Sequence, residues 1–284
     1  MAQEVTLTAS MRANLISLQN TEVLLNRTQE RLATGKKVNS ALDNPLNFFA
    51  ASAHMQRAND LTARKDGMGE AIQAIKATNA GIEGIKTLLE SARGLVEAAR
   101  SESGDRATIE AQYNTVMAQI RRLAVDSGYK GTNVIVSGTN GSASGSNTTL
   151  DVLFNENGTN KLTLRGFDGR NSALGTAGSR LLTNAGANFS NASVLNAVAA
   201  AITSAISELQ SEASKLASNL SIINARLDFT KQMVNTLKEG ADKLTLADTN
   251  EEGANMLALQ TRQQLGVTSL SLASQAAQSV LRLF

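Results

Sequence analysis

The chain has 284 residues, a net charge of +2 and no cysteine, which excludes disulfides, thiolate nucleophiles and thiolate metal sites. Acidic and basic residues are interspersed and no 18-residue window is wholly apolar, so we expect neither a nucleic-acid partner nor a membrane span. Aromatic residues make up only 3% of the chain, and the small aliphatics that remain favour close helix–helix contacts over a thick globular core.

The amino-terminal part predicts two helices separated by a loop. A first helix is expected over about 10–34, and Gly35 stands where a left-handed residue would end it. The stretch 36–44 is polar, and Pro45 disfavours helical backbone just before it, so we expect a change of direction there. A second helix is then expected over about 46–100.

This second helix repeats apolar residues every seven positions, with a second set three residues after the first. The two sets are Leu61, Met68, Ile75, Ile82, Leu89 and Val96, and Ala71, Ile85, Ala92 and Ala99. Such spacing keeps one face of a helix against a partner over many turns. A third helix is expected over 106–126, with one apolar face made of Ile109, Tyr113, Val116, Ile120 and Leu123.

The middle of the chain differs from both ends in composition. Residues 127–193 are rich in Gly, Ser, Thr and Asn, and the helical period disappears. Within them, 149–155 and 160–165 are predicted to be two strands joined by a hairpin turn that contains Gly158. A further short strand is possible at 133–136.

A long helix returns over about 191–246, with apolar residues at alternating steps of four and three. This seam consists of Leu195, Ala199, Ile202, Ile206, Leu209, Ala213, Leu216, Leu220, Ile223, Leu227, Thr230, Val234, Leu237, Ala241 and Leu244. At a rise of 1.5 Å per residue, a helix of about 50 residues is about 75 Å long. A long rod of this kind suits an assembly better than an enzyme pocket.

The last helix begins after a break at 247–250, where Thr249 and Glu252 are interpreted as a capping box. Its apolar residues form two adjacent stripes. One stripe contains Leu259, Leu270, Ala273, Ala277, Val280 and Phe284, and the other contains Leu265, Leu272, Ala276 and Leu283. One intramolecular neighbour would cover only one stripe, so we expect other copies of the chain to cover the second.

No residue pattern indicates catalysis, a cofactor or a metal. The sole histidine, His54, lies seven residues before Leu61 on the apolar stripe and is interpreted as a packed or partly exposed helix residue. A single histidine without cysteine cannot build the usual zinc site. We therefore expect no enzyme, no cofactor and no metal.

Both ends of the chain resemble bacterial flagellins of the alphaproteobacterial type. The amino-terminal run SLQNTEVLLNRTQERLATGKKVNSALDNPLNFFAA resembles the family's helix, glycine stop and loop. The carboxy-terminal ADTNEEGANMLALQTRQQL and the final SVLRLF resemble its last helix. The resemblance covers about 1–130 and 195–284.

This resemblance implies a mainly α fold, a long antiparallel helical rod with a small central β-hairpin region. Residues 1–42 with 250–284 would form a terminal-helix inner-core domain, and 43–127 with 191–249 a helical rod domain. Residues 128–190 would form a small β-rich variable region attached to the rod. The implied function is that of a structural subunit which self-assembles into the helical filament of the bacterial flagellum and gives motility.

The apolar positions of the terminal helices are the expected polymerisation interface. They are Leu15, Leu18, Leu25, Leu32, Leu259, Leu265, Leu270, Leu272, Val280, Leu283 and Phe284. The implied partners are other copies of the chain or other flagellins, an export chaperone on the carboxy-terminal helices, and hook–filament junction and filament cap proteins.

The start of the chain shows no cleavable secretory signal. The family resemblance implies secretion by flagellar type III export and a place in the extracellular filament. Two other interpretations remain open: a hook–filament junction protein, which shares the terminal helices, and a secreted coiled-coil binding module. An enzyme is a remote third.

Overall fold

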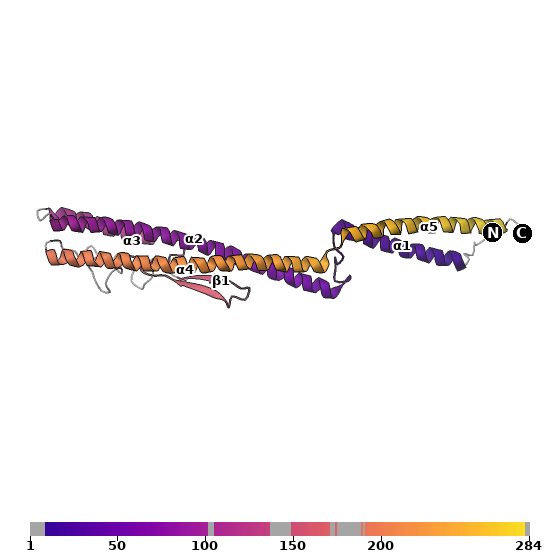
Figure 1. Cartoon of the computed structure of the whole chain (residues 1–284), viewed down its shortest axis with the longest axis horizontal. Helices are drawn as coiled ribbons and strands as arrows, with labels where there is room; N and C mark the ends of the chain where they lie inside the picture. Colours follow the sequence, from indigo (N-terminus) through magenta and orange to yellow (C-terminus); the bar gives the residue numbers. More distant parts are fainter. Residues whose placement is uncertain are drawn as a thin grey trace. The chain divides into compact units, whose positions relative to one another are not determined.

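The structure is a computed structural model that describes residues 9–101, 105–136, 149–170, 174, 189 and 191–281. These residues form five helices and one antiparallel two-stranded sheet (Figure 1). The helices are α1 (Ala9–Thr34), α2 (Pro45–Ser101), α3 (Arg106–Asp126), α4 (Ala192–Thr245) and α5 (Thr249–Leu281), and the strands are β1 (Thr149–Leu153) and β2 (Lys161–Arg165). The predicted mainly helical fold with one β-hairpin is confirmed.

The chain divides into two compact units. Met1–Gln56 and Thr236–Phe284 make one, here called the terminal unit, and Arg57–Asn235 makes the other, the central unit. Helices α2 and α4 each contribute residues to both. The three-part domain division expected from the sequence stays a prediction.

The core of the central unit is built from the predicted heptad seams. Every member of the α2 seam from Leu61 to Val96 is at most 6% exposed. The α4 seam alternates between fully buried residues such as Ile202 and Leu209 and half-buried residues such as Ile206. Burying one Leu or Ile side chain contributes about 1.5–3 kcal/mol, so these repeats supply much of the unit's stability.

Helix α3 packs closely against α2. An added Cβ at Gly84 of α2 would lie 2.8 Å from Leu123 Cδ2 of α3, and one at Gly81 would lie 2.6 Å from the Cβ of Ser127, just after α3, so neither position has room for a larger residue. The buried face of α3 is centred on Met117 and Ala124, while the predicted face residues Val116 and Leu123 are only half-buried. The predicted face is therefore correct in part and slightly rotated.

Residues 133–136 form no strand, so that suggestion was wrong. Asn133 Nδ2 donates to the carbonyls of Ala124 and Val125, both at 2.9 Å, and so closes the end of α3. Asn133 Oδ1 accepts the N–H of Ile135 at 2.9 Å, which removes a donor that a strand would need. Only one isolated bridge, Val136 with Asp168, remains.

The β-hairpin is shorter than predicted but has the expected turn. Leu153 pairs with Lys161 at its closed end, and Gly158 in the turn has φ +68°. Val152 and Leu164 are buried in the core of the central unit. The strands stop before Asn155 because its side chain accepts the N–H of Asn160 and organises the turn.

Helix α4 is the one described helix long and apolar enough to cross a membrane by length and composition, with a mean hydropathy of 1.4 over 18 residues. Its buried apolar residues from Leu195 to Ile223 belong to the hydrophobic cluster that also contains residues of α2 and α3. Of the apolar window itself, 33% is buried within the structure.

Candidate assembly surface

Helices α1 and α5 pair side by side and antiparallel within the terminal unit (Figure 1). At one end, Arg31 Nη1 lies 2.7 Å from Glu252 Oε1. At the other, Asn14 Nδ2 donates to Ser269 Oγ at 3.4 Å. Both contacts fit the same antiparallel register, so one register holds from one contact to the other.

A small residue lets the two helices approach between these ends. An added Cβ at Gly266 would lie 2.6 Å from Leu18 Cδ2. Leu18 thus packs directly over the α5 backbone, as a knob packs into a hole. Leu25, Leu32, Leu259 and Leu270 are half-buried along the two helices.

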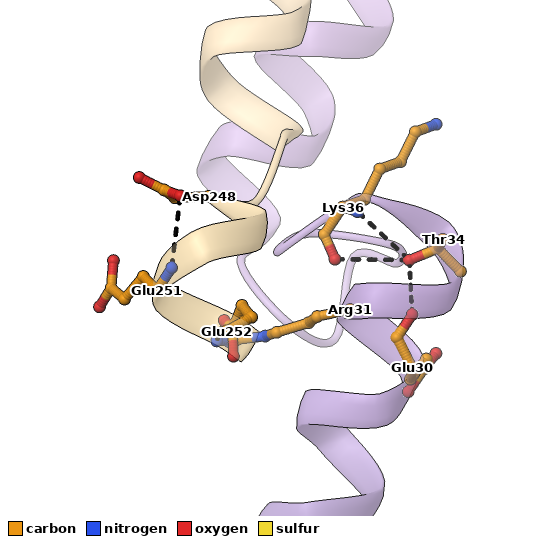
Figure 2. A network of polar contacts seen from close by, with 7 residues as sticks. All are labelled: Glu30, Arg31, Thr34, Lys36, Asp248, Glu251 and Glu252. Carbon is orange, nitrogen blue, oxygen red and sulfur yellow. Dashed lines mark hydrogen bonds and ion pairs between the residues drawn. The ribbon is translucent and has the colours of Figure 1, made fainter. Parts of the chain in front are cut away.

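The Arg31–Glu252 ion pair is the main polar contact of this helix pair. The Glu252 side chain is 9% exposed and that of Arg31 is 31% exposed. Figure 2 shows Arg31 reaching from the last turns of α1 to the first turn of α5. A largely buried carboxylate needs a partner, so this contact penalises any other register of the two helices.

The capping box predicted from Thr249 and Glu252 was wrong. Asp248 caps α5, since its Oδ1 accepts the N–H of Asn250 at 2.9 Å and that of Glu251 at 3.3 Å. Figure 2 shows the second of these bonds. Glu252 pairs with Arg31 instead of returning to the helix start. Sequence reasoning missed this because Arg31 lies 221 residues away, and only the folded chain brings the two together.

The two segments that join the terminal helices to α2 and α4 are hydrogen-bonded to each other. Gly35 ends α1 with φ +69°, as predicted, and its carbonyl accepts the N–H of Ala247 at 3.0 Å. Lys37 N donates to Thr245 O at 2.8 Å. These bonds join the chain just after α1 to the chain just before α5, at one end of the α1–α5 pair.

The loop before α2 is closed by two side chains. Asp43 Oδ2 accepts the N–H groups of Ser40 at 3.0 Å and Asn39 at 3.1 Å, and these bonds lower the pKa of Asp43 below its ordinary value. Asn44 Oδ1 accepts Asn47 N at 3.1 Å and so caps α2, with Pro45 as its first residue.

The remaining predicted interface residues are exposed or fall outside the described side chains. Leu15 is exposed, and Leu265 and Leu272 are 66% and 61% exposed. The side chain of Val280, and Leu283 and Phe284 as a whole, lie outside the described part of the chain. The structure thus places three of the four members of the second α5 stripe, Leu265, Leu272 and Ala276, on the surface.

Further exposed apolar residues on the same two helices escaped the sequence analysis. They are Ile16, Val23 and Leu24 on α1, and Leu257 and Val267 on α5. Ile16 and Val23 are seven residues apart, so a second heptad row beside the paired seam was the signal that could have found them.

The central unit shows much less apolar surface. Among its described residues, the exposed large hydrophobic side chains are Val125, Ile222 and Phe229. A monomeric protein rarely leaves a large continuous apolar patch in water. The exposed rows of α1 and α5 therefore mark the terminal unit as the surface suited to contact with another protein.

The described residues offer no arrangement suited to metal binding: no group of three or more His, Asp or Glu side chains comes together there. His54 is half-buried on α2, and its Cδ2 lies 4.0 Å from where a Cβ at Gly240 of α4 would stand. This position agrees with its interpretation as a packed helix residue.

Comparison with known proteins matches both ends of the chain to one family. The bacterial flagellin N-terminal helical region matches residues 5–140, and the bacterial flagellin C-terminal helical region matches residues 199–284. The segment between them, 141–198, contains the β-hairpin.

Individual relatives extend the match over nearly the whole chain. Flagellin FljK of Caulobacter vibrioides is 29% identical over 95% of this chain and 95% of its own length. The flagellin of Brucella melitensis is 28% identical over 100% of this chain and 99% of its own length. The crystal structure of Bacillus cereus flagellin overlaps loosely, with a TM-score of 0.48, 15% identity, and coverage of 58% of this chain and 88% of that one.

Two family regions in the expected order cover most of the chain, and full-length relatives carry the same name. The chain therefore belongs to the bacterial flagellin family.

Proposed function

As a flagellin, the chain is a structural subunit that self-assembles into the flagellar filament and serves motility, and we propose that it joins the filament through the terminal unit. The observation that carries this proposal is the unpartnered apolar surface on α1 and α5, to which Leu15, Leu265 and Leu272 belong. Contacts between two different patches of one chain generate an open helical filament when the rotation that they impose does not close into a ring.

In this proposal the eleven residues from Leu15 to Phe284 named above divide into two roles. The half-buried ones, Leu18, Leu25, Leu32, Leu259 and Leu270, hold α1 and α5 together. The exposed ones, Leu15, Leu265 and Leu272, face neighbouring copies. Val280, Leu283 and Phe284 are assigned to the interface on the family resemblance alone. Burial of apolar area at each contact is repeated in every subunit, so no single contact has to be strong.

The domain roles follow the same division. Residues 1–42 with 250–284 would form the inner core of the filament, and 43–127 with 191–249 the helical rod around it. The small region 128–190 would remain on the outside. The different apolar surface of the terminal and central units supports this assignment.

The remaining roles rest on family membership. We propose that the chain is secreted, that it has no enzymatic activity, and that an export chaperone binds its carboxy-terminal helices before export. Hook–filament junction and filament cap proteins would contact the two ends of the filament.

Seeded assembly tests the proposal. Purified chain is added to short filament fragments with precipitant salt and viewed by negative-stain electron microscopy, beside a variant that lacks residues 250–284. Long uniform filaments from the full chain alone are expected. Rods or small particles from both proteins would favour the junction-protein or coiled-coil interpretation instead.

A further inference from the structure

A second apolar feature of the terminal unit lies away from the α1–α5 pair. Leu42, Leu46 and Phe49 are 96%, 78% and 63% exposed. Leu46 and Phe49 are three residues apart in the first turns of α2 and share one face, and Leu42 precedes them in the adjoining loop. These three residues are called the apolar row below.

The loop that carries this row is held in one shape by the Asp43 and Asn44 hydrogen bonds described above. Phe49 is further supported by an edge-on contact with Phe48, with ring centroids 5.6 Å apart. The row is therefore fixed before it meets any partner, which lowers the entropy lost on binding.

The same unit contains an apolar groove between the start of α2 and the end of α4. It has a volume of about 230 Å³. Its apolar lining consists of Val38, Phe48, Ala51, Met55 and Ala241. A dry cavity of about 150 Å³ is large enough for benzene, so this groove has room for one phenyl or leucyl side chain.

The row cannot fill the groove of its own chain. At 3.6 residues per turn, Leu46 and Phe49 point to one side of α2, while Ala51 and Met55 point almost directly opposite. A chain with an apolar projection on one side and an apolar groove on the other is complementary to a second copy of itself. Repetition of such a contact builds an open filament when its rotation does not close into a ring.

We propose that the apolar row of one subunit docks into the α2–α4 groove of the next subunit in the filament. The inference rests on the proposed function, and it adds a contact outside α1 and α5. The family to which the chain belongs self-assembles, so a second copy of the chain is the expected occupant. Lys36 and Asp242 both line the groove, so its charges offset each other and the apolar contact carries the proposal.

Engineered cysteines test the contact directly, because the chain has none of its own. Leu46→Cys places a thiol in the row and leaves Phe49 in place, and Met55→Cys places one in the groove. Nine helical residues separate the two positions by about 13.5 Å, too far for a disulfide within one chain. Filaments of the double variant are oxidised and run on a denaturing gel without reductant.

The expected result is a ladder of trimers and longer oligomers from the double variant, with monomers from each single variant. Filaments without such a ladder would overturn this inference and leave the proposed function intact. Disulfide-linked dimers from the Leu46→Cys single variant would also overturn the inference, because the apolar row of one subunit would then contact the apolar row of another. If the unsubstituted chain forms no filaments, both the proposed function and this inference fail.

A second measurement uses paired serine substitutions. Leu46→Ser with Phe49→Ser should raise the critical concentration for assembly at least about tenfold, because two apolar side chains no longer become buried. Ile222→Ser with Phe229→Ser, two exposed apolar residues of the central unit, is the matched control and should change it less than about twofold. Equal effects of the two pairs would contradict the proposed contact.

Discussion

Arg31 and Glu252 are unequal partners because their surroundings differ. Glu252 is almost fully buried, whereas Arg31 can still reach water. Loss of Arg31 leaves a buried carboxylate without an ion-pair partner, while loss of Glu252 leaves a guanidinium that water can solvate. Removal of Arg31 and removal of Glu252 should therefore lower the free energy of unfolding by different amounts.

Arg31→Ala should lower the free energy of unfolding of the α1–α5 pair by about 2–3 kcal/mol, and Glu252→Ala by only about 1 kcal/mol. Thermal melting of assembled filaments, followed by circular dichroism, would measure both. The double variant completes the cycle and isolates the pair's coupling energy. Equal losses from the two single variants would show that Glu252 is not the buried partner.

Asp43 gives a pH prediction at the same scale. Hydrogen bonds from the N–H groups of Ser40 and Asn39 hold its pKa below the ordinary 3.8. A lowered pKa in the folded state means that the loop's stabilisation is present above pH 3.8 and is lost as pH falls through the folded-state pKa. The amide NMR signals of Ser40 and Asn39 should therefore titrate with a midpoint below 3.8.

Asp43→Asn is the control for this titration, since it removes the ionisable group and should abolish the low-pH transition at both amides. A midpoint at or above 3.8 in the unsubstituted chain would contradict the hydrogen-bonded carboxylate.

At the scale of the elements, two glycines of α2 occupy opposite environments. An added Cβ at Gly81 would collide with Ser127 Cβ of the segment that follows α3, at 2.6 Å, and with Ile135 Cδ1, at 2.7 Å. An added Cβ at Gly67 would meet nothing within 4 Å. Both positions lie inside the same helix, so the gain in helix propensity from alanine is the same.

Gly67→Ala should therefore raise the free energy of unfolding of the central unit by about 0.5–1 kcal/mol. Gly81→Ala should lower it by about 1–3 kcal/mol, because the segment that follows α3, with Ser127 and Ile135, must move away from α2. Chemical denaturation followed by circular dichroism measures both variants. A Gly81→Ala protein as stable as Gly67→Ala would show that this segment does not pack so closely against α2.

The sequence predicted those elements whose burial follows a simple period. The seven-residue repeat from Leu61 to Val96 identified the buried face of α2, and Gly35 identified the end of α1. Side-chain hydrogen bonds without a period were not predictable. Asn133 prevented a strand at 133–136, and Asp248 took the capping role assigned to Thr249.

The candidate assembly surface was predicted only in part, for a related reason. The heptad pattern identifies the apolar residues of α1 and α5. However, the residues packed between the two helices and the exposed residues beside them repeat with the same period. Leu18 packs over Gly266 while Leu15 and Leu272 are exposed, and only the register of the two helices separates these roles.

At the scale of the whole molecule, apolar surface is distributed unevenly between the two units. The central unit buries its heptad seams, whereas the terminal unit leaves apolar rows on α1 and α5 exposed. This combination suits a structural subunit. The central unit buries its apolar side chains within one chain, whereas the terminal unit can bury its exposed rows only against other copies.

Leu272→Asp tests this central claim most directly, through seeded assembly viewed by electron microscopy. Leu272 is 61% exposed, so the substituted subunit should keep its helix content, but an unpaired charge buried between copies should block filament growth. Val125→Asp, at an exposed apolar residue of the central unit, is the matched control and should still give filaments. Uniform filaments from Leu272→Asp would contradict assembly through this surface of α5.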